Sequence, residues 1–463
     1  MIAPLSTTRV TRNKLGRGLA VFVGFLMLQA PAGSVEPADK TPDSSAKERA
    51  SAVRKLVAED YERLEKLYKH LHAHPELSKK EEETAARMAA ELRALGFEVT
   101  EKVGGHGVVG VLKNGKGPTV LVRTDMDALP VEEKTGLPYA SKVRARDKDG
   151  NDVGVMHACG HDMHMTCWAG TAKVLVSMKD QWQGTLVFIG QPAEEIGSGA
   201  RAMLEDGLFK RFPKPDHCLA LHCEAQRAHG ELGYTEGTAL ANVDSVDVVV
   251  KGKGGHGAWP QTTVDPIVLS ARIILDLQTI VSREIGPFDP AVVTVGSIHG
   301  GTKHNIIPNE VKLQITVRTT KDETRKHVLE AIPRIAKGDA EAARAPEPEV
   351  KVIPAEFTPA LVNDTGLTRK TVAALKDAFG ADKVKDRPPV MGGEDFSRYG
   401  REGIPVCLFW LGTVDAERVA EAAKEKGKPL PSLHSDLFYP VPEPTIKTGV
   451  TAMSLAVLNL LGK

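Results

Sequence analysis

Residues 185–195 read TLVFIGQPAEE, an apolar run that ends in two adjacent carboxylates. A short run of apolar and aromatic residues predicts a buried strand, Thr185–Gly190. Glu194 and Glu195 follow this strand, and α/β proteins bind their ligands at the carboxyl ends of strands. We therefore expect a covered sheet with a functional site at this edge.

Strands and helices alternate through most of the chain. We predict further strands at Gly107–Leu112, Thr119–Thr124, His217–His222 and Val406–Leu411, and helices at Ala52–His72, Lys79–Leu95, Met165–Lys179, Thr365–Phe379 and Thr445–Leu461. This alternation is typical of an α/β fold in which helices cover both faces of a sheet. The predicted fold class is thus α/β, with a mixed-sheet catalytic domain flanked by helices.

The order of predicted elements changes in the middle of the chain. The pattern indicates strands at Ser245–Lys251, Val292–Ile298 and Val311–Thr319, helices at Val264–Glu284 and Lys321–Ala336, and an extended segment at Glu349–Pro354. That order is β-α-β-β-α-β, the ferredoxin-like arrangement. We therefore predict an inserted domain at 244–354, between two parts of the catalytic domain at 51–243 and 355–463.

The N-terminal segment has the pattern of a secretory signal peptide. Four basic residues precede the short apolar run Leu19–Leu28, and Ala30-Pro31-Ala32 offers a cleavage site. Ten apolar residues are too few to span a bilayer. We expect a signal peptide at 1–32, a Pro-, Ser- and Lys-rich linker at 33–50, and export to the periplasm or the medium without stable membrane insertion.

Charge and cysteine content exclude several classes of protein. The 463 residues include 60 basic and 60 acidic side chains, so nothing indicates nucleic acid as a partner. Five cysteines are too few, and odd in number, for a disulfide framework. Cys218 and Cys223 can pair, although a role as small buried apolar residues is favoured.

Residues 157–164, HACGHDMH, gather three histidines, a cysteine and an aspartate. Any one of these suits a structural role, but a core would have to desolvate all of them. Cys159 and His161, two residues apart, can reach one metal, and His222 closes its predicted strand. One of Glu194 and Glu195 can hold a metal while its neighbour handles a proton. Metal-assisted hydrolysis is therefore the leading hypothesis.

Several motifs resemble those of one known family, and they follow one another in the same order as in that family. They are LHAHPELS (71–78), DMDALP (125–130), HACGHDMH (157–164), QPAEE (191–195), GGHG (254–257), NIIP (305–308) and GGEDFS (392–397). With them the chain resembles the dinuclear metallopeptidases that include carboxypeptidase G-type enzymes and aminoacylases. It is most similar to the amidohydrolase branch with hippurate hydrolase and auxin-conjugate hydrolases.

The resemblance implies a site for two divalent metals. Its ligands would be Cys159, His161, Glu195, His222 and His434, and Glu194 would be the general base. Zinc is expected from the N, S and O donors, with manganese, cobalt or nickel as alternatives.

Two acidic residues stand where the wider family has a His-x-Asp triplet. Asp127 matches the aspartate of this triplet and would orient a ligand or a metal, whereas Asp125 has no firm role. The resemblance implies that His161 supplies the missing histidine ligand. His164 fits the motif and suits a structural role equally well.

The resemblance also implies that the inserted domain acts as a lid and dimerises. His256 would then reach the partner's active site and stabilise the oxyanion, while Asn305 and Arg318 would grip the carboxylate of the substrate. Gly392 and Gly393 match substrate-binding positions. His72, His74 and Glu76 are expected to fix the end of the first helix, which Pro75 breaks.

The sequence thus predicts an exported, homodimeric amidohydrolase that cleaves N-acyl amino acids with metal-activated water. A carboxypeptidase or dipeptidase on the same two-metal site is the alternative. A zinc deaminase would require a Pro-Cys-x-x-Cys motif that the chain lacks. A protein with a purely structural metal site would not need Glu194. The acyl group, the amino acid and the native metal stay open.

Overall fold

The structure, a computed structural model, describes residues 44–462. The predicted signal peptide and residues 33–43 of the predicted linker lie outside the described residues. Helix α1 spans Ser44–Ala73, so the prediction of a linker is wrong for residues 44–50. The apolar side of this helix extends back to Ala50 and Val53, which are both buried. No helix in the described part of the chain is both long and apolar enough to cross a membrane.

A mixed sheet of eight strands forms the larger core. Its order is β1-β2-β6-β3-β7-β18-β8-β17. The bounds are β1 Glu98–Val103, β2 Gly107–Asn114, β6 Gly184–Gln191, β3 Thr119–Asp125, β7 His217–Ala228, β18 Val406–Val414, β8 Leu232–Tyr234 and β17 Val384–Asp386. The central strands β6, β3, β7 and β18 are parallel, while β1, β2 and β6 pair antiparallel. The predicted mixed sheet is confirmed.

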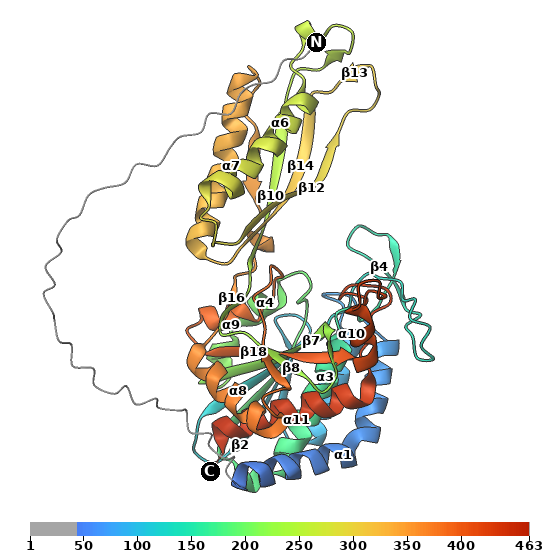
Figure 1. Ribbon diagram of the computed structural model, residues 1–463, viewed down its shortest axis with the longest axis vertical. Coiled ribbons are helices and arrows are strands. Elements are labelled where there is room, and N and C mark those ends of the chain that lie inside the picture. The colour runs from blue at the N-terminus through green and yellow to red at the C-terminus, as the bar shows by residue number, and fades with distance from the viewer. Residues whose placement is uncertain (1–43, 463) are drawn as a thin grey trace, which may run out of the picture. The chain divides into compact units, whose positions relative to one another are not determined.

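Helices cover both faces of this sheet because successive side chains of a buried strand point to opposite sides. In β6, Leu186 and Phe188 join one apolar core, and Val187 and Ile189 join another. The first core includes α1, α2 (Glu82–Ala94), α3 (His161–Ser177), α8 (Thr365–Phe379) and α11 (Pro442–Leu461). The second includes α4 (Gly199–Glu205), α5 (Leu208–Arg211) and α9 (Ser397–Arg401) (Figure 1).

Helix α11 is buried along most of its length because it packs against α1, α3 and α8. Its contact with α3 depends on two glycines. A Cβ atom at Gly170 would lie 2.6 Å from Val450, and one at Gly449 would lie 2.4 Å from the Cys167 sulfur. The close packing of α3 fixes its first turn, which carries His161.

Residues 242–352, called here the ferredoxin-like region, form a separate antiparallel sheet with the order β12-β14-β10-β15. The strands are β10 Asn242–Lys251, β12 Ala291–Gly300, β14 Glu310–Thr319 and β15 Glu349–Val352, and the helices are α6 Pro266–Thr279 and α7 Asp322–Ala342. The predicted β-α-β-β-α-β order is confirmed. The exact domain bounds and the role of this region as a lid stay predictions.

One face of this small sheet packs against α6 and α7, through residues such as Val248 and Leu313. Burial alternates along β10 and β14. Arg318 therefore lies on the face away from the helices, where it pairs in register with Val243.

Short elements that we did not predict complete the fold. They are β1, β8, β17, α4, α5, α9 and α10 Ala416–Ala422, the pairs β4 Arg144–Arg146 with β5 Asp152–Gly154, β9 Gly237–Leu240 with β16 Leu361–Asn363, and β11 Gly255–His256 with β13 Ile306–Ile307, and the turns η1 Lys179–Gln181, η2 Pro260–Thr262 and η4 Pro354–Glu356. Most of these elements are too short for a periodic pattern to predict them. The end of the predicted helix Val264–Glu284 forms a π-helical turn, η3 Ile280–Glu284. The β9–β16 pair joins the segments that flank the ferredoxin-like region.

Candidate metal centre

The site lies where β3 and β6 end. Their last residues, Asp125 and Gln191, pair in parallel register, and the loops that follow carry Asp127 and the Glu194-Glu195 pair. His222 does not close its strand as predicted, because β7 continues to Ala228. The pairing of β7 with β3 ends at Ala220, and β7 continues beyond this point beside β18. His222 is nevertheless next to this edge, since only one residue separates it from Ala220.

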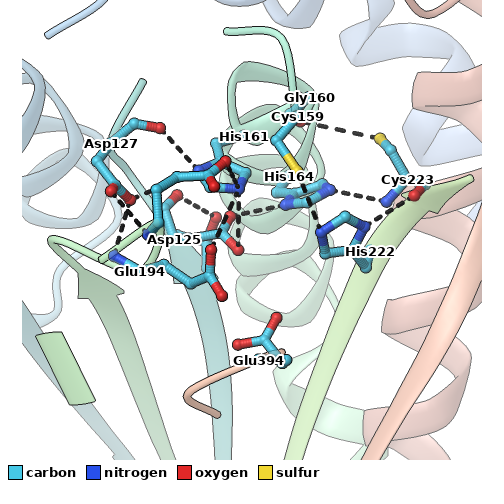
Figure 2. Close-up of polar contacts among 12 residues, drawn as sticks. Asp125, Asp127, Cys159, Gly160, His161, His164, Glu194, His222, Cys223 and Glu394 are labelled. Carbon is cyan, nitrogen blue, oxygen red and sulfur yellow. Dashed lines mark hydrogen bonds and ion pairs between the residues drawn. The ribbon is translucent and has the colours of Figure 1, made fainter. Parts of the chain in front are cut away.

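The five predicted metal ligands come together from four parts of the chain. Cys159 lies in the turn before α3, and its sulfur is 3.6 Å from His222 Nε2. His161 is the first residue of α3, and its Nε2 is 3.7 Å from Glu195 Oε1. His434 Nε2 lies 3.5 Å from Glu195 Oε2. Figure 2 shows the side chains of Cys159, His161 and His222 converging beside Glu194.

These atoms fit metal binding. Ligand atoms of Cys159, His161 and His222 lie within 4.8 Å of one another, and so do those of Cys159, Glu195 and His434. His161 Nε2 and Glu195 Oε1 are buried without a hydrogen-bond partner among the described residues. A thiol, imidazoles and a carboxylate are donors that zinc and related divalent metals prefer. The two groups share Cys159, as expected of a site for neighbouring cations.

The electrostatics of the site also favour cations. Burial raises the pKa of Glu194 well above its usual range, and the nearby charges of Glu394, Glu195 and Asp395 raise it further. Burial likewise raises the pKa of Glu195, to about 7. Several carboxylates thus share a buried space, where like charges disfavour ionisation. A bound cation would relieve this repulsion.

Asp127 holds the two glutamates and His161 in place. Its Oδ1 accepts a hydrogen bond from the backbone N–H of Glu194, and its Oδ2 accepts one from that of Glu195, both at 3.0 Å. Its backbone carbonyl is 2.7 Å from His161 Nδ1. In the neutral ring, donation from Nδ1 to this carbonyl leaves Nε2 without a proton, so that it can bind a metal. This geometry suits the orienting role that we predicted for Asp127.

His164 is better explained as a structural residue than as a ligand. Its Nδ1 is 2.7 Å from Asp125 Oδ1, and its Nε2 accepts a hydrogen bond from the backbone N–H of Cys223 at 2.8 Å. Asp125, His161 and His164 lie close enough to share a cation, but both ring nitrogens of His164 are already engaged. Asp125 in turn orients His164.

Sequence reasoning missed a buried arginine beneath the site. Arg123 donates to Asp125 at 2.7 Å, to Glu394 at 2.8 Å and to Asp395 at 3.3 Å. A basic residue inside the apolar strand Thr119–Asp125 was the available signal, because a buried arginine requires acidic partners. Glu394 and Asp395 belong to the GGEDFS motif, so Arg123 joins this distant loop to β3.

A cavity of about 830 Å³ opens onto four of the predicted metal ligands, Cys159, Glu195, His222 and His434. Gly392, Gly393 and Arg318 line it together with Glu194. A Cβ atom at Gly393 would lie 2.7 Å from Val243, so glycine allows this loop to approach β10. Arg318 donates to Thr316 Oγ1 at 3.0 Å and has no acidic partner among the described residues. Arg318 is therefore not engaged in an ordinary surface ion pair within the described residues.

His256 and Asn305 lie together but away from this cavity. β11 and β13 pair through His256 and Ile306, and the carbonyl of Asn305 accepts a hydrogen bond from Gly257. Both predicted residues are exposed, and neither lines the cavity. The structure of one chain thus does not bring them to the predicted metal ligands. The reach of His256 into a partner's site and the contact of Asn305 with the substrate stay predictions.

The remaining candidates have structural partners. His72 is buried between Asp162, at 2.6 Å, and Glu133, at 3.1 Å, so it joins α1 to α3. His74 contacts the carbonyl of His70 within α1, as expected of a residue at the end of this helix. Glu76 instead accepts the backbone N–H groups of residues 83 and 84, at the start of α2. All five cysteines are free and buried, so Cys218 and Cys223 are not paired.

The fold and the site define a metal-dependent hydrolase that acts on amides. The model of peptidase family M20/M25/M40 matches residues 121–431, and the chain belongs to this family. It is 37% identical over 358 residues to N-acetylcysteine deacetylase from Bacillus subtilis, covering 77% of this chain and 89% of that protein. It is 38% identical over 334 residues to hippurate hydrolase from Campylobacter jejuni, covering 72% and 83%.

Solved structures agree with this assignment. A dinuclear metal-binding peptidase of the M20 family from Bacillus subtilis has a TM-score of 0.69 and 31% identity, covering 87% of this chain and all of that one. A putative aminohydrolase from methicillin-resistant Staphylococcus aureus has a TM-score of 0.77 and 32% identity, covering 89% of this chain and all of that one.

Proposed function

We propose that the chain hydrolyses the amide bond of N-acyl amino acids. The observation that carries this proposal is the guanidinium of Arg318, which lines the same cavity as Glu194 and the metal ligands without an acidic partner of its own. A guanidinium binds a carboxylate bidentately. Similar proteins include one that hydrolyses hippurate and one that deacetylates N-acetylcysteine.

Glu194 has the position and the basicity of a general base. It neighbours the ligand Glu195, and its Oε2 is 3.9 Å from His161 Nε2. Burial raises its pKa, which suits a residue that accepts a proton and returns it. In the proposed reaction it takes a proton from the attacking water and returns it to the leaving nitrogen. The hydrogen bond to Asp127 holds the backbone of Glu194 in place during both proton transfers.

Cys159, His161, Glu195, His222 and His434 would hold two divalent cations. Zinc is the first candidate, with manganese, cobalt or nickel as alternatives. Cations bound there would activate water and polarise the substrate carbonyl.

A carboxypeptidase acting on the same site is the second candidate. The chain is 36% identical over 397 residues to a thermostable carboxypeptidase from Saccharolobus solfataricus. Both activities need a free carboxylate on the leaving half, so they differ in the acyl half alone. Comparing kcat/KM for N-acetyl, N-benzoyl and dipeptide substrates with the same C-terminal residue would show which of the two activities is greater.

Replacing the proposed base should stop turnover without removing metal. Glu194→Gln keeps the shape of the side chain but cannot accept the proton, so we expect kcat to fall by roughly 10²–10⁴-fold. Elemental analysis should still find the metal content of the wild type. As a matched control, Glu195→Gln changes the neighbouring residue in the same way and should lose metal. Near wild-type kcat in Glu194→Gln would disprove the role of Glu194.

Arg318 should matter only for substrates with a carboxylate. Arg318→Lys keeps the charge but loses the bidentate geometry. We expect kcat/KM for an N-acyl amino acid to fall at least tenfold, and kcat/KM for the matching amide without a carboxylate to change little. Equal responses of the two substrates, or none, would show that Arg318 is not the carboxylate anchor.

We also propose that the enzyme is a homodimer that joins through the ferredoxin-like region. Val268 and Leu275 on α6 are 61% and 70% exposed, and Ile298 on the edge strand β12 is 50% exposed. Large exposed apolar surface is typical of an interface, and a two-fold dimer would carry His256 towards the partner's cavity.

Mixing two inactive variants tests this arrangement. A dimer of one His256→Ala subunit and one Glu194→Gln subunit would contain one intact site, so random mixing should restore up to about a quarter of wild-type activity. The same mixture after Leu275→Lys in both chains should stay inactive, and sedimentation should then report monomers. No recovery from a mixture shown to contain heterodimers would contradict the shared site.

Finally, we propose that the protein is exported after cleavage of residues 1–32, on the strength of the basic and apolar pattern that precedes Ala30-Pro31-Ala32. Mass spectrometry of protein from its native host should find an N-terminus near Gly33. An intact Met1 would overturn this proposal.

A further inference from the structure

Besides Arg318, two other arginines line the cavity, Arg201 and Arg387, and Arg387 has no part in the proposed reaction. Arg387 follows β17, and its side chain is 14% exposed. Its Nε donates to Glu224 Oε1 at 2.9 Å. The guanidinium carbon lies 3.9 Å from the centroid of the Trp410 ring, and this ring packs against that of His222 with centroids 5.3 Å apart. Arg387 is therefore one aromatic ring away from a metal ligand.

Two buried donors at this place lack an acceptor. Arg387 Nη1 and Trp410 Nε1 are both buried and have no hydrogen-bond partner among the described residues. Both residues line the cavity, and Trp410 is only 3% exposed. Buried donors in native proteins are nearly always paired, because an unpaired one is costly. Two such donors on stacked side chains indicate a site for an oxygen acceptor.

The local charge balance leaves Arg387 positive. Glu224 accepts from two arginines: Arg387 through Oε1, and Arg227 through Oε2 at 2.7 Å. Arg227 also has Glu231 at 4.0 Å, whereas Glu224 is the only acidic partner of Arg387 in the part of the chain that the structure describes. One carboxylate thus serves two guanidinium groups, and Glu231, the other acidic partner of Arg227, is shared with Lys383 and Lys385. The oxygen acceptor that fits here is an anion.

We propose that Arg387 and Trp410 bind a second carboxylate of the substrate. The preferred substrates are then N-acyl amino acids with two carboxylates, one held by Arg318 and the other by Arg387. This inference rests on the proposed function. Stacking on Trp410 fixes the plane of the guanidinium, which suits bidentate binding. The second carboxylate belongs to the side chain of the amino acid or to the far end of the acyl group.

Two matched pairs of substrates test the proposal and separate these sources. N-benzoylglutamate and N-benzoylglutamine differ in a side-chain carboxylate, and N-succinylalanine and its terminal amide differ in an acyl carboxylate. We expect the wild type to favour the charged member of one pair by at least tenfold in kcat/KM, mainly through KM. Arg387→Gln should abolish this preference, and Arg387→Lys should restore part of it, because the charge remains.

Arg227→Gln is the control variant. It removes the other arginine from Glu224, and Arg227 does not line the cavity, so the preference for the charged substrate should persist. Thermal unfolding and metal content of each variant report whether the fold and the metal site are intact.

The proposal is overturned if neither pair shows a preference, if the preference survives in Arg387→Gln, or if Arg227→Gln abolishes it equally. The last result would mean that Arg387 acts through Glu224.

Hydrolysis of N-benzoylglycine separates this inference from the proposed function. If the wild type cleaves N-benzoylglycine but shows no preference within either pair, only the second anchor fails. If it cleaves no N-acyl amino acid, both proposals fail.

Discussion

The carboxylate of Asp127 is the point at which three segments of the site meet. It receives the backbone N–H groups of Glu194 and Glu195, and the carbonyl of the same residue contacts His161. Ala193, just before the two glutamates, has a φ of 51°, a left-handed conformation that non-glycine residues seldom adopt. Glu81 accepts the backbone N–H of Ala193 at 2.7 Å and helps to hold this turn. These hydrogen bonds fix the backbone of the two adjacent glutamates.

Charge balance is the second constraint on the site. Arg123 is fully buried among Asp125, Glu394 and Asp395, and Glu194 lies close by. One arginine does not neutralise four carboxylates, so burial and mutual repulsion raise the pKa of Asp395 to about 7 and that of Glu194 well above its usual range. Cation binding would relieve the same repulsion. The stability of this edge of the sheet should therefore be coupled to metal binding.

The ferredoxin-like region uses its two faces differently. Alternate residues of β10 and β14 form a core with the helices, and the residues between them form an open polar face. Arg318 lies on this open face, beside the loop of Gly392 and Gly393. An arginine on the open face can enter a cavity that belongs mainly to another part of the chain. The alternation of buried and exposed residues along β14 thus places Arg318 on the face that meets the cavity.

The sequence by itself determined the features that local patterns encode. Apolar runs and helical stripes predicted β2 and the four central parallel strands of the large sheet, the order of the ferredoxin-like region and the long helices. The family resemblance named all five ligand candidates and Glu194. Contacts between distant residues were not accessible in this way. Only the tertiary structure decided that His222 lies within β7, that both nitrogens of His164 are engaged, and that residues 44–50 are helical. It also brought Arg123 to the GGEDFS loop and Arg387 onto Trp410. The physical reason is that a buried charge is defined by its partners, and here those partners lie up to 272 residues away along the chain.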